Sequence, residues 1–208
     1  MKVALLNPGY GNLFSMSRFL SRLSIDFDIA STYSNREQEA LYDAIIVPGI
    51  GHFGSGIRRL KSSNLDRFIE DEFARGTLIV GICLGFQLLC RRSEEEPEIE
   101  GLGLVPFEVV SNRNLGLTKS VNNGWDFLKS SKNFDLENNE DIGPVYFSNS
   151  YGVSVELVKT MPNVEYLYKS NSSLIGYIKH GNVIGIQFHP EKSRDFGENL
   201  FTKTLRSH

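Results

Sequence analysis

Residues 77–90, TLIVGICLGFQLLC, decide the fold of this chain. The apolar run 77–82 predicts a buried strand, and the stretch FQLLCRR after Gly85 predicts a helix. Cys83 lies between them, with Gly81 and Gly85 two residues to either side. The pattern G-x-nucleophile-x-G is typical of a nucleophile elbow, in which glycines allow a sharp turn and a close approach of strand and helix. We therefore expect Cys83 at the apex of a strand–turn–helix unit.

The two cysteines of the chain, Cys83 and Cys90, call for separate interpretations. Cys83 is either a nucleophile or a small buried hydrophobic residue, and its motif alone leaves both possibilities open. The free N–H groups of the following helix could bind an oxyanion beside its sulfur. Cys90 is expected about two turns into that helix, after Leu88-Leu89, where it would pack in the core. Two cysteines in 208 residues are no secreted disulfide framework, which favours a reducing, cytoplasmic location.

Strands and helices alternate in the first half of the chain. Short apolar runs that end at turn residues predict buried strands, and apolar residues at helical spacing predict the helices between them. This alternation predicts an α/β fold, with an open, mostly parallel sheet flanked by helices on both faces. The expected strands are 2–6, 25–30, 43–48 and 77–82, and the expected helices are 13–23 (capped by Asn12), a polar helix before Asp43, and helical pieces over 54–75.

The second half of the chain has a different pattern. Its segments are short, rich in Val, Ile, Tyr and Phe, and separated by Gly and Asn, which predicts antiparallel strands added to the sheet edge. These segments are 104–110, 143–151, 153–158, 164–168, 174–178 and 183–188, with a polar surface loop over 129–141 and a closing helix over 196–205. The length and the lack of an internal repeat predict a single domain over residues 1–208.

The charge and hydropathy of the chain exclude several classes of partner. The formal net charge is −3, so no basic field favours nucleic acid or an anionic membrane surface. The first residues, MKVALLNPGYGN, do not have the pattern of a signal peptide. No apolar stretch approaches the roughly 20 residues that cross a bilayer. We therefore expect a soluble, cytoplasmic protein with no membrane partner.

A reactive cysteine needs a base, and His189 is the strongest candidate among the four histidines. It ends the apolar strand VIGIQF and begins the tripeptide His-Pro-Glu. In an extended segment the side chains of His189 and Glu191 point to one face, so the carboxylate could orient the imidazole. We expect Cys83, His189 and Glu191 to meet at the carboxyl ends of strands, where open α/β sheets carry their sites. The other histidines are His52 after a PGIG turn, His180 before a predicted solvated hairpin turn, and His208 at the end of the chain.

Taken together, these motifs resemble those of the class I (triad) glutamine amidotransferases, and within them the glutaminase subunits of imidazole glycerol phosphate synthase. The matching pieces occur in order along most of the chain, and the set is specific although no single piece is. They are GYGNLFSMSRFL at 9–20, VPGIGHFGSGI at 47–57, GICLGFQLL at 81–89, the acidic run followed by GLGLV at 101–105, GW at 124–125, SNSYGV at 148–153 and QFHPEKS at 187–193.

The resemblance implies a role for each matching residue. Cys83 would attack the side-chain amide of glutamine and form a thioester, His189 would carry the protons, and Glu191 would orient His189. Backbone N–H groups of Gly49, Ile50, Gly51 and Leu84 would form the oxyanion hole. The implied glutamine contacts are Gln87, Glu95, Ser150 and Tyr151, with the alternatives that Gln87 is an ordinary polar helix position and Glu95 part of a solvated acidic run.

The resemblance also implies a partner. Ammonia released from glutamine would pass through a dry tunnel to a (β/α)8 cyclase subunit on the histidine pathway, without a metal or an organic cofactor. An alternative is a paralogous glutaminase that feeds an ATP-dependent sugar amidotransferase in bacterial surface-polysaccharide synthesis. A catalytically silent regulatory subunit would be expected to lose one of the triad residues. Cysteine peptidases and chaperones of the same broad fold lack the His-Pro-Glu tripeptide.

Three segments depart from the pattern of the resembled branch. Where that branch has Pro-His-Met/Ile-Gly-Trp-Asn, this chain has Val-Asn-Asn-Gly-Trp-Asp at 121–126. Its usual His-Ser-Tyr is Asn149-Ser150-Tyr151 here, and its Asp-Tyr before the first glycine is Asn7-Pro8. The triad is intact while these segments differ, so the chemistry is expected to be kept and the identity of the partner is left open.

Overall fold

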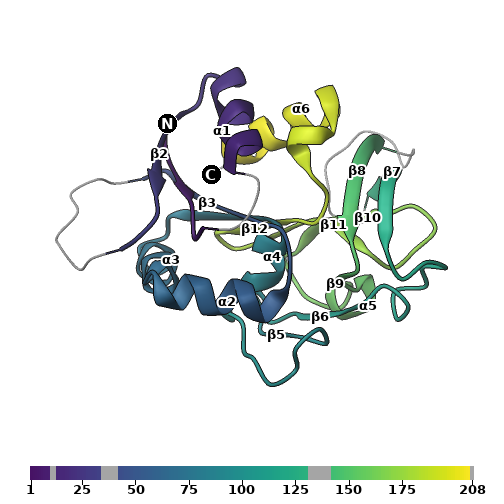
Figure 1. Cartoon of the computed structure of the whole chain (residues 1–208). Coiled ribbons are helices and arrows are strands. Elements are labelled where there is room, and N and C mark those ends of the chain that lie inside the picture. Colours follow the sequence, from purple (N-terminus) through teal and green to yellow (C-terminus); the bar gives the residue numbers. More distant parts are fainter. Residues whose placement is uncertain (10–12, 34–41, 131–141, 207–208) are drawn as a thin grey trace.

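The computed structural model describes residues 1–9, 13–33, 42–130 and 142–206. Its centre is a nine-stranded sheet (Figure 1). Five strands are parallel to one another, and four further strands continue the sheet in antiparallel pairing. In spatial order the strands are β2 (Asp26–Ala30), β1 (Lys2–Leu6), β3 (Ala44–Gly49), β4 (Leu78–Cys83), β12 (Val183–Ile186), β11 (Ile175–His180), β10 (Glu165–Lys169), β7 (Asn122–Ser130) and β8 (Ile142–Asn149).

Helices cover both faces of the parallel half, as Figure 1 shows. Alternate residues of each strand point to opposite faces, so Val3 and Leu5 pack with one set of helices and Ala4 and Leu6 with the other. Burial on both faces explains why these strands are continuous apolar runs in the sequence. One face carries α1 (Leu13–Arg22) and α6 (Arg194–Arg206), and the other carries α2 (Phe53–Ser62), α3 (Leu65–Ala74) and α4 (Leu84–Leu89).

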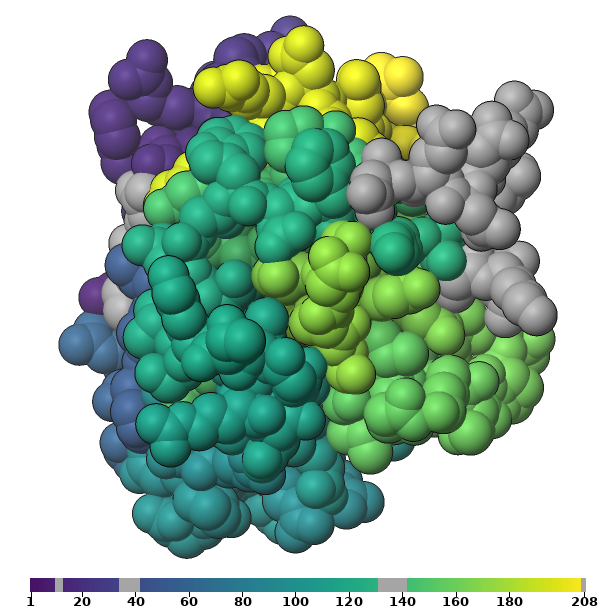
Figure 2. Space-filling model, turned by 90° about the vertical axis from the view of Figure 1, so that its right-hand side faces the viewer, coloured from purple at the N-terminus to yellow at the C-terminus, as the bar shows by residue number. Residues whose placement is uncertain are grey.

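A second, three-stranded sheet lies beside the antiparallel half. It contains β5 (Arg92–Ser93), β6 (Glu108–Ser111) and β9 (Tyr151–Val153), and the short helix α5 (Val155–Val158) follows β9. Figure 2 shows this side of the molecule, where the teal middle of the chain lies against the green segment that follows it. The turn between β8 and β9 therefore joins the two sheets, and this turn contains Ser150.

The fold class predicted from the sequence is confirmed, and the errors are local. The segment 183–188 was expected among the antiparallel edge strands, but β12 is parallel to β4 because it inserts between β4 and β11. Part of the expected strand 153–158 is the helix α5, where the Ser154 side chain accepts a hydrogen bond from the Glu156 N–H as an N-cap. β7 was not expected, because its first residues are Asn and Gly, which are uncommon in strands.

Several other expectations are adjusted or fall outside the described residues. The segment 104–110 contributes only the end of its length to β6, which belongs to the small sheet. The cap at Asn12, nearly all of the polar helix before Asp43 and most of the loop 129–141 lie outside the described residues. No helix in the described part of the chain is long and apolar enough to cross a membrane.

Candidate active site

The nucleophile elbow forms where β4 passes directly into α4. Cys83 has φ 54° and ψ −112°, a backbone conformation that residues other than glycine rarely adopt. The flanking glycines are required by contact: a Cβ on Gly81 would lie 2.6 Å from the Phe86 Cα, and one on Gly85 would lie 1.7 Å from the Val47 carbonyl oxygen. The helix thus packs against β3 and β4 at backbone distance, and the Cys83 side chain is held at the top of the turn.

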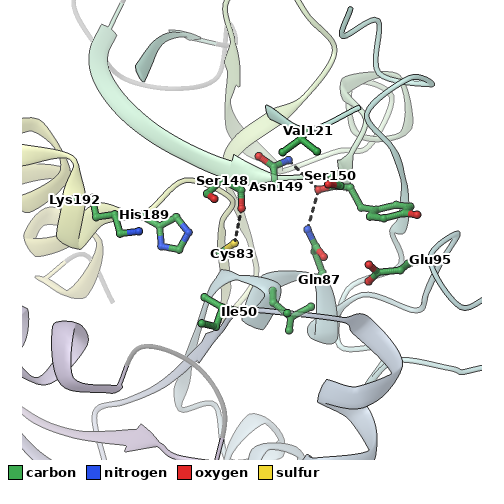
Figure 3. Close-up of a pocket in the computed structure, with 13 residues that line it drawn as sticks. Ile50, Cys83, Gln87, Glu95, Val121, Ser148, Asn149, Ser150, His189 and Lys192 are labelled. Atoms are coloured by element: carbon green, nitrogen blue, oxygen red, sulfur yellow. Dashed lines mark hydrogen bonds between the residues drawn. The ribbon is translucent and has the colours of Figure 1, made fainter. Parts of the chain in front are cut away.

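A cavity of about 400 Å³ opens above Cys83 (Figure 3). Its size suits a ligand such as an amino acid, and six separate stretches of the chain line it, of which three carry most of the lining residues. One wall is the elbow, a second is the turn between β8 and β9, and a third is the segment after β12 with His189 and Lys192. The parallel and antiparallel halves of the sheet therefore meet at this cavity.

His189 and Glu191 form a close pair beside Cys83. The His189 Nδ1 and Glu191 Oε1 atoms are 2.9 Å apart, and both side chains are buried. The segment is held by Ser193, whose hydroxyl donates to the His189 carbonyl at 2.6 Å and accepts from the Tyr146 N–H at 2.9 Å. The expected extended geometry is wrong, because Glu191 lies in a 3₁₀ turn, η1 (Pro190–Lys192), that folds its carboxylate back onto the imidazole.

The surroundings of the His189 imidazole favour its protonated form. Burial by itself lowers the pKa of this side chain, but hydrogen bonds and charge interactions with Cys83 and Glu191 outweigh burial and raise the pKa to about 10. The Cys83 Sγ lies 3.8 Å from the Ser148 carbonyl oxygen, the contact drawn in Figure 3. The structure thus brings together Cys83, His189 and Glu191, the residues predicted to be a nucleophile, a base and a carboxylate that orients the base.

The residues predicted to contact glutamine gather on the opposite side of the cavity. Gln87, Glu95, Ser150 and Tyr151 all line it. The Gln87 side chain extends from α4 and donates to the Tyr151 carbonyl oxygen at 2.8 Å. The Glu95 carboxylate accepts a hydrogen bond from the Phe53 N–H at 2.7 Å, which fixes it at the start of α2. This contact means that Glu95 is not part of a freely solvated acidic run.

The residues predicted for an oxyanion hole lie beside the elbow. Ile50, Gly51 and Leu84 line the cavity, and Gly51 has a φ of 103°. Gly49 is the last residue of β3, where it pairs with Cys83, and a Cβ added to it would lie 2.8 Å from the Gly85 N atom. Gly49 and Glu191 do not line the cavity themselves. Gly49 pairs with Cys83 and Glu191 contacts His189, and both of these partners line the cavity.

The other histidines and Cys90 have different surroundings. His52 precedes α2 and pairs with Glu96 through a contact of 3.2 Å between Nδ1 and Oε2. His180 ends β11 before the turn, where it was expected to be solvated, but it is partly buried with its ring against Phe107. Cys90 is fully buried in the apolar core, as expected, and burial raises the pKa of its thiol.

Sequence reasoning missed several residues around the cavity. The unexpected lining residues are Val121, Ser148, Asn149 and Lys192. Gln187 was missed as well, although its position two residues before His189 is a signal that it faces the same side. Asn122 and Asn149, from two of the segments noted as departures from the resembled pattern, contact each other, since the Asn122 Nδ2 donates to the Asn149 Oδ1 at 3.2 Å.

Comparison with known proteins finds a matching family model and several similar proteins. A family model described as glutamine amidotransferase class-I matches residues 10–206. A protein of Thermotoga maritima named imidazole glycerol phosphate synthase subunit HisH is 32% identical, over 99% of this chain and 96% of that protein. A protein of the same name from Halalkalibacterium halodurans is 35% identical, over 95% of this chain and 92% of its own length.

Solved structures show the same fold. A structure described as a glutamine amidotransferase has a TM-score of 0.69 at 19% identity and covers 99% of both chains. The structure of PurLQS from Thermotoga maritima has a TM-score of 0.71 at 20% identity and covers 99% of this chain and 98% of that chain. The similarity in sequence along nearly the whole chain shows that the protein belongs to the class-I glutamine amidotransferase family.

Proposed function

We propose that this chain is the glutaminase subunit of an imidazole glycerol phosphate synthase. It hydrolyses glutamine to glutamate and supplies the ammonia to a cyclase subunit. The observation that carries the proposal is the cavity in which Cys83, with His189 and Glu191 beside it, faces Gln87 and Glu95. The curated relatives that bear the name HisH support the same assignment.

We propose a reaction that uses the positions of these side chains. The Cys83 proton passes to His189, and Sγ attacks the amide carbon of glutamine to form a C–S bond. N–H groups of Gly49, Ile50, Gly51 and Leu84 are proposed to bind the oxygen that becomes negative. The C–N bond then breaks as His189 returns its proton to the leaving nitrogen, which gives ammonia.

Hydrolysis of the thioester completes the cycle. A water molecule gives a proton to His189 as its oxygen attacks the thioester carbon, and the C–S bond breaks. Glutamate leaves, and the proton returns to the sulfur. Glu191 supports the positive charge of His189 at both stages, in agreement with the raised pKa of that imidazole.

The proposed partner surface lies on β7, beside the cavity. Trp125 and Phe127 are exposed although they are large and apolar. Trp125 also stacks with the Arg194 guanidinium at 5.1 Å. We infer that a cyclase of the (β/α)8 type covers this surface and receives the ammonia through a tunnel. The proposed setting is the cytoplasm, where reducing conditions keep a cysteine nucleophile free.

A second acceptor is favoured by one observation. Asn122 and Asn149 stand where the resembled branch has two histidines. Their side chains form a hydrogen bond with each other, next to the proposed partner surface. A coordinated change of this kind is expected if the chain feeds a different synthase, and an ATP-dependent sugar amidotransferase is the candidate. The glutaminase chemistry is the same for either acceptor.

One assay tests both proposals. Glutamate release from glutamine is measured with the protein alone, with the cyclase subunit and its nucleotide ligand, and with the sugar amidotransferase. We expect the cyclase to stimulate glutamate release. Stimulation by the sugar amidotransferase alone would assign the second acceptor. Absence of glutamate release under all three conditions would contradict the glutaminase proposal and favour a silent regulatory subunit.

A further inference from the structure

Gln187 is a buried polar side chain that the proposed reaction does not use. It follows β12 directly, between that strand and His189, and it is completely buried. Its backbone N–H donates to the Gly176 carbonyl at 2.9 Å, so the main chain continues the pairing of β12 with β11. Its side-chain carboxamide lies between two residues of the site, Cys83 and Gln87. Burial of a carboxamide costs free energy unless both its oxygen and its NH₂ group have hydrogen-bond partners.

The orientation of this carboxamide is fixed by a backbone carbonyl. The Tyr151 carbonyl oxygen can only accept a hydrogen bond, so the Gln87 side chain must present its NH₂ group to it, at 2.8 Å. The same NH₂ group lies 3.1 Å from Gln187, which must therefore present its oxygen, Oε1. It follows that the NH₂ group of Gln187 faces the Cys83 Sγ, at 3.9 Å.

This chain of contacts has two consequences for the site. Both amide hydrogens of Gln87 are engaged, so the group that Gln87 can offer to a ligand in the cavity is an acceptor oxygen. The sulfur of Cys83 lies between a donor, the Gln187 NH₂ group, and an acceptor, the Ser148 carbonyl. The donor favours the thiolate and the acceptor favours the thiol, so removal of the donor would shift the balance toward the thiol.

We propose that Gln187 is a positioning residue that sets the amide orientation of Gln87 and stabilises the negative sulfur of Cys83 through one carboxamide. The proposal deepens the proposed function and rests on it for the identity of the substrate. The contacts themselves do not depend on which synthase receives the ammonia. Gly152 lies against the same carboxamide, since a Cβ there would lie 2.3 Å from the Leu174 Cδ1 and 3.3 Å from the Gln187 Oε1.

Two substitutions separate the two roles. Gln187→Glu keeps an oxygen toward Gln87 but replaces the donor toward Cys83 with a negative oxygen. Gln187→Met keeps the approximate volume and removes both contacts. Asn182→Ala is the matched control, because Asn182 precedes β12 and its amide donates only to the Phe73 and Thr77 carbonyls among the described contacts, away from the cavity.

The first measurement is the pH dependence of alkylation of the free protein by iodoacetamide, which reacts with the thiolate. Peptide mass analysis identifies the Cys83 adduct separately from the buried Cys90. The titratable side chains around the same cavity are His189 and Lys192 from the segment after β12, Tyr151 from β9 and Glu95 from the loop after β5, with Glu191 behind His189. They are unchanged in all three variants, so differences in the midpoint report on residue 187.

We expect the alkylation midpoint to move up by about one pH unit or more in Gln187→Glu and by a smaller amount in Gln187→Met. The KM for glutamine should rise about tenfold in Gln187→Met, where the Gln87 amide is released, and stay near the original value in Gln187→Glu. Asn182→Ala should lower the melting temperature and change neither property. Unchanged alkylation midpoints in folded Gln187→Glu and Gln187→Met would overturn the proposal.

The two proposals fail in different ways. Alkylation needs neither glutamine nor a partner. Shifted midpoints in a protein that releases no glutamate with any synthase would reject the proposed function and retain the role of Gln187 toward the sulfur. Unshifted midpoints in a protein that does release glutamate would reject the role of Gln187 alone. Should Gln187→Met not fold, Gln187→Glu, which preserves the shape and the contact with Gln87, decides the outcome.

Discussion

The two ends of α4 carry the two cysteines of this protein, and their surroundings are opposite. Cys83 precedes the helix with a positive φ of 54°, lines the cavity and interacts with His189. Cys90 follows the helix with an ordinary φ of −72°, and its thiol donates to the Phe86 carbonyl at 3.5 Å within the core. Burial hardly distinguishes them, since Cys83 is 5% and Cys90 is 0% exposed.

The proposed nucleophile therefore differs from the other cysteine in its backbone conformation and its partners rather than in its exposure. At Cys83 the backbone has a positive φ and the sulfur interacts with His189, whose pKa is raised. At Cys90 apolar neighbours disfavour the thiolate, which raises the pKa of that thiol. Substitutions at the two ends of α4 should therefore have separable effects on chemistry and on stability.

The largest effect is expected from Cys83→Ala. Loss of the sulfur removes the nucleophile, so glutamine-dependent activity should fall by more than about a thousandfold. Synthesis by the partner with added ammonia should be retained, because the fold and the partner surface are unchanged. Parallel assays with glutamine and with ammonium salt check this expectation. Substantial glutamine-dependent activity in Cys83→Ala would show that the nucleophile is elsewhere.

The next effect is expected from Gly85→Ala, which breaks the elbow without touching either sulfur. The added Cβ would lie 1.7 Å from the Val47 carbonyl oxygen, so strand β3 and helix α4 must move apart. We expect a loss of about 3 kcal/mol in the free energy of unfolding, together with loss of activity. Urea denaturation measures the first quantity. Gly76→Ala is an informative control, because a Cβ there has open space within 4 Å and only its φ of 89° is unfavourable.

A pH-dependent effect is expected from His189. Its pKa is raised from an ordinary 6.5 to about 10, so the associated stabilisation is fully present below about pH 6.5 and is lost as pH rises toward 10. Because one proton is involved, the free energy of unfolding should fall by at most about 1.4 kcal/mol per pH unit across this window. Urea denaturation between pH 6 and pH 10 measures the slope.

Glu191→Gln provides the comparison for this slope. The substitution removes one cause of the raised pKa, the charge 2.9 Å from the His189 Nδ1, so the fall in stability should end at a lower pH and be smaller in total. His189→Gln should abolish the contribution. A slope that is the same in all three proteins would mean that His189 does not carry the proton in this range.

The smallest effect is expected from Cys90→Ala. Removal of a buried sulfur leaves a small cavity in the core, which should cost about 1 kcal/mol in the free energy of unfolding. Glutamine-dependent activity should remain close to that of the unmodified protein. The same denaturation and glutaminase assays check both expectations. A large loss of activity with little change in stability would contradict the distinction between the two cysteines.

The sequence determined the parts of the protein that depend on local pattern. Continuous apolar runs identified the strands that are buried on both faces, and the glycines around Cys83 identified the elbow. The tripeptide His-Pro-Glu predicted that His189 and Glu191 lie together, although the geometry that joins them is a 3₁₀ turn rather than an extended strand. These features are encoded within a few residues, so they can be recognised without knowledge of their neighbours.

Only the tertiary structure decided which distant segments complete the cavity. The direction of β12 depends on its insertion between β4 and β11, and the turn from Ser148 to Tyr151 reaches Cys83 and Gln87 across more than sixty residues of sequence. The contacts of Gln187 with both ends of the site arise in the same way. Side-chain partners of this kind are set by the packing of the two halves of the sheet, for which short-range sequence patterns carry no signal.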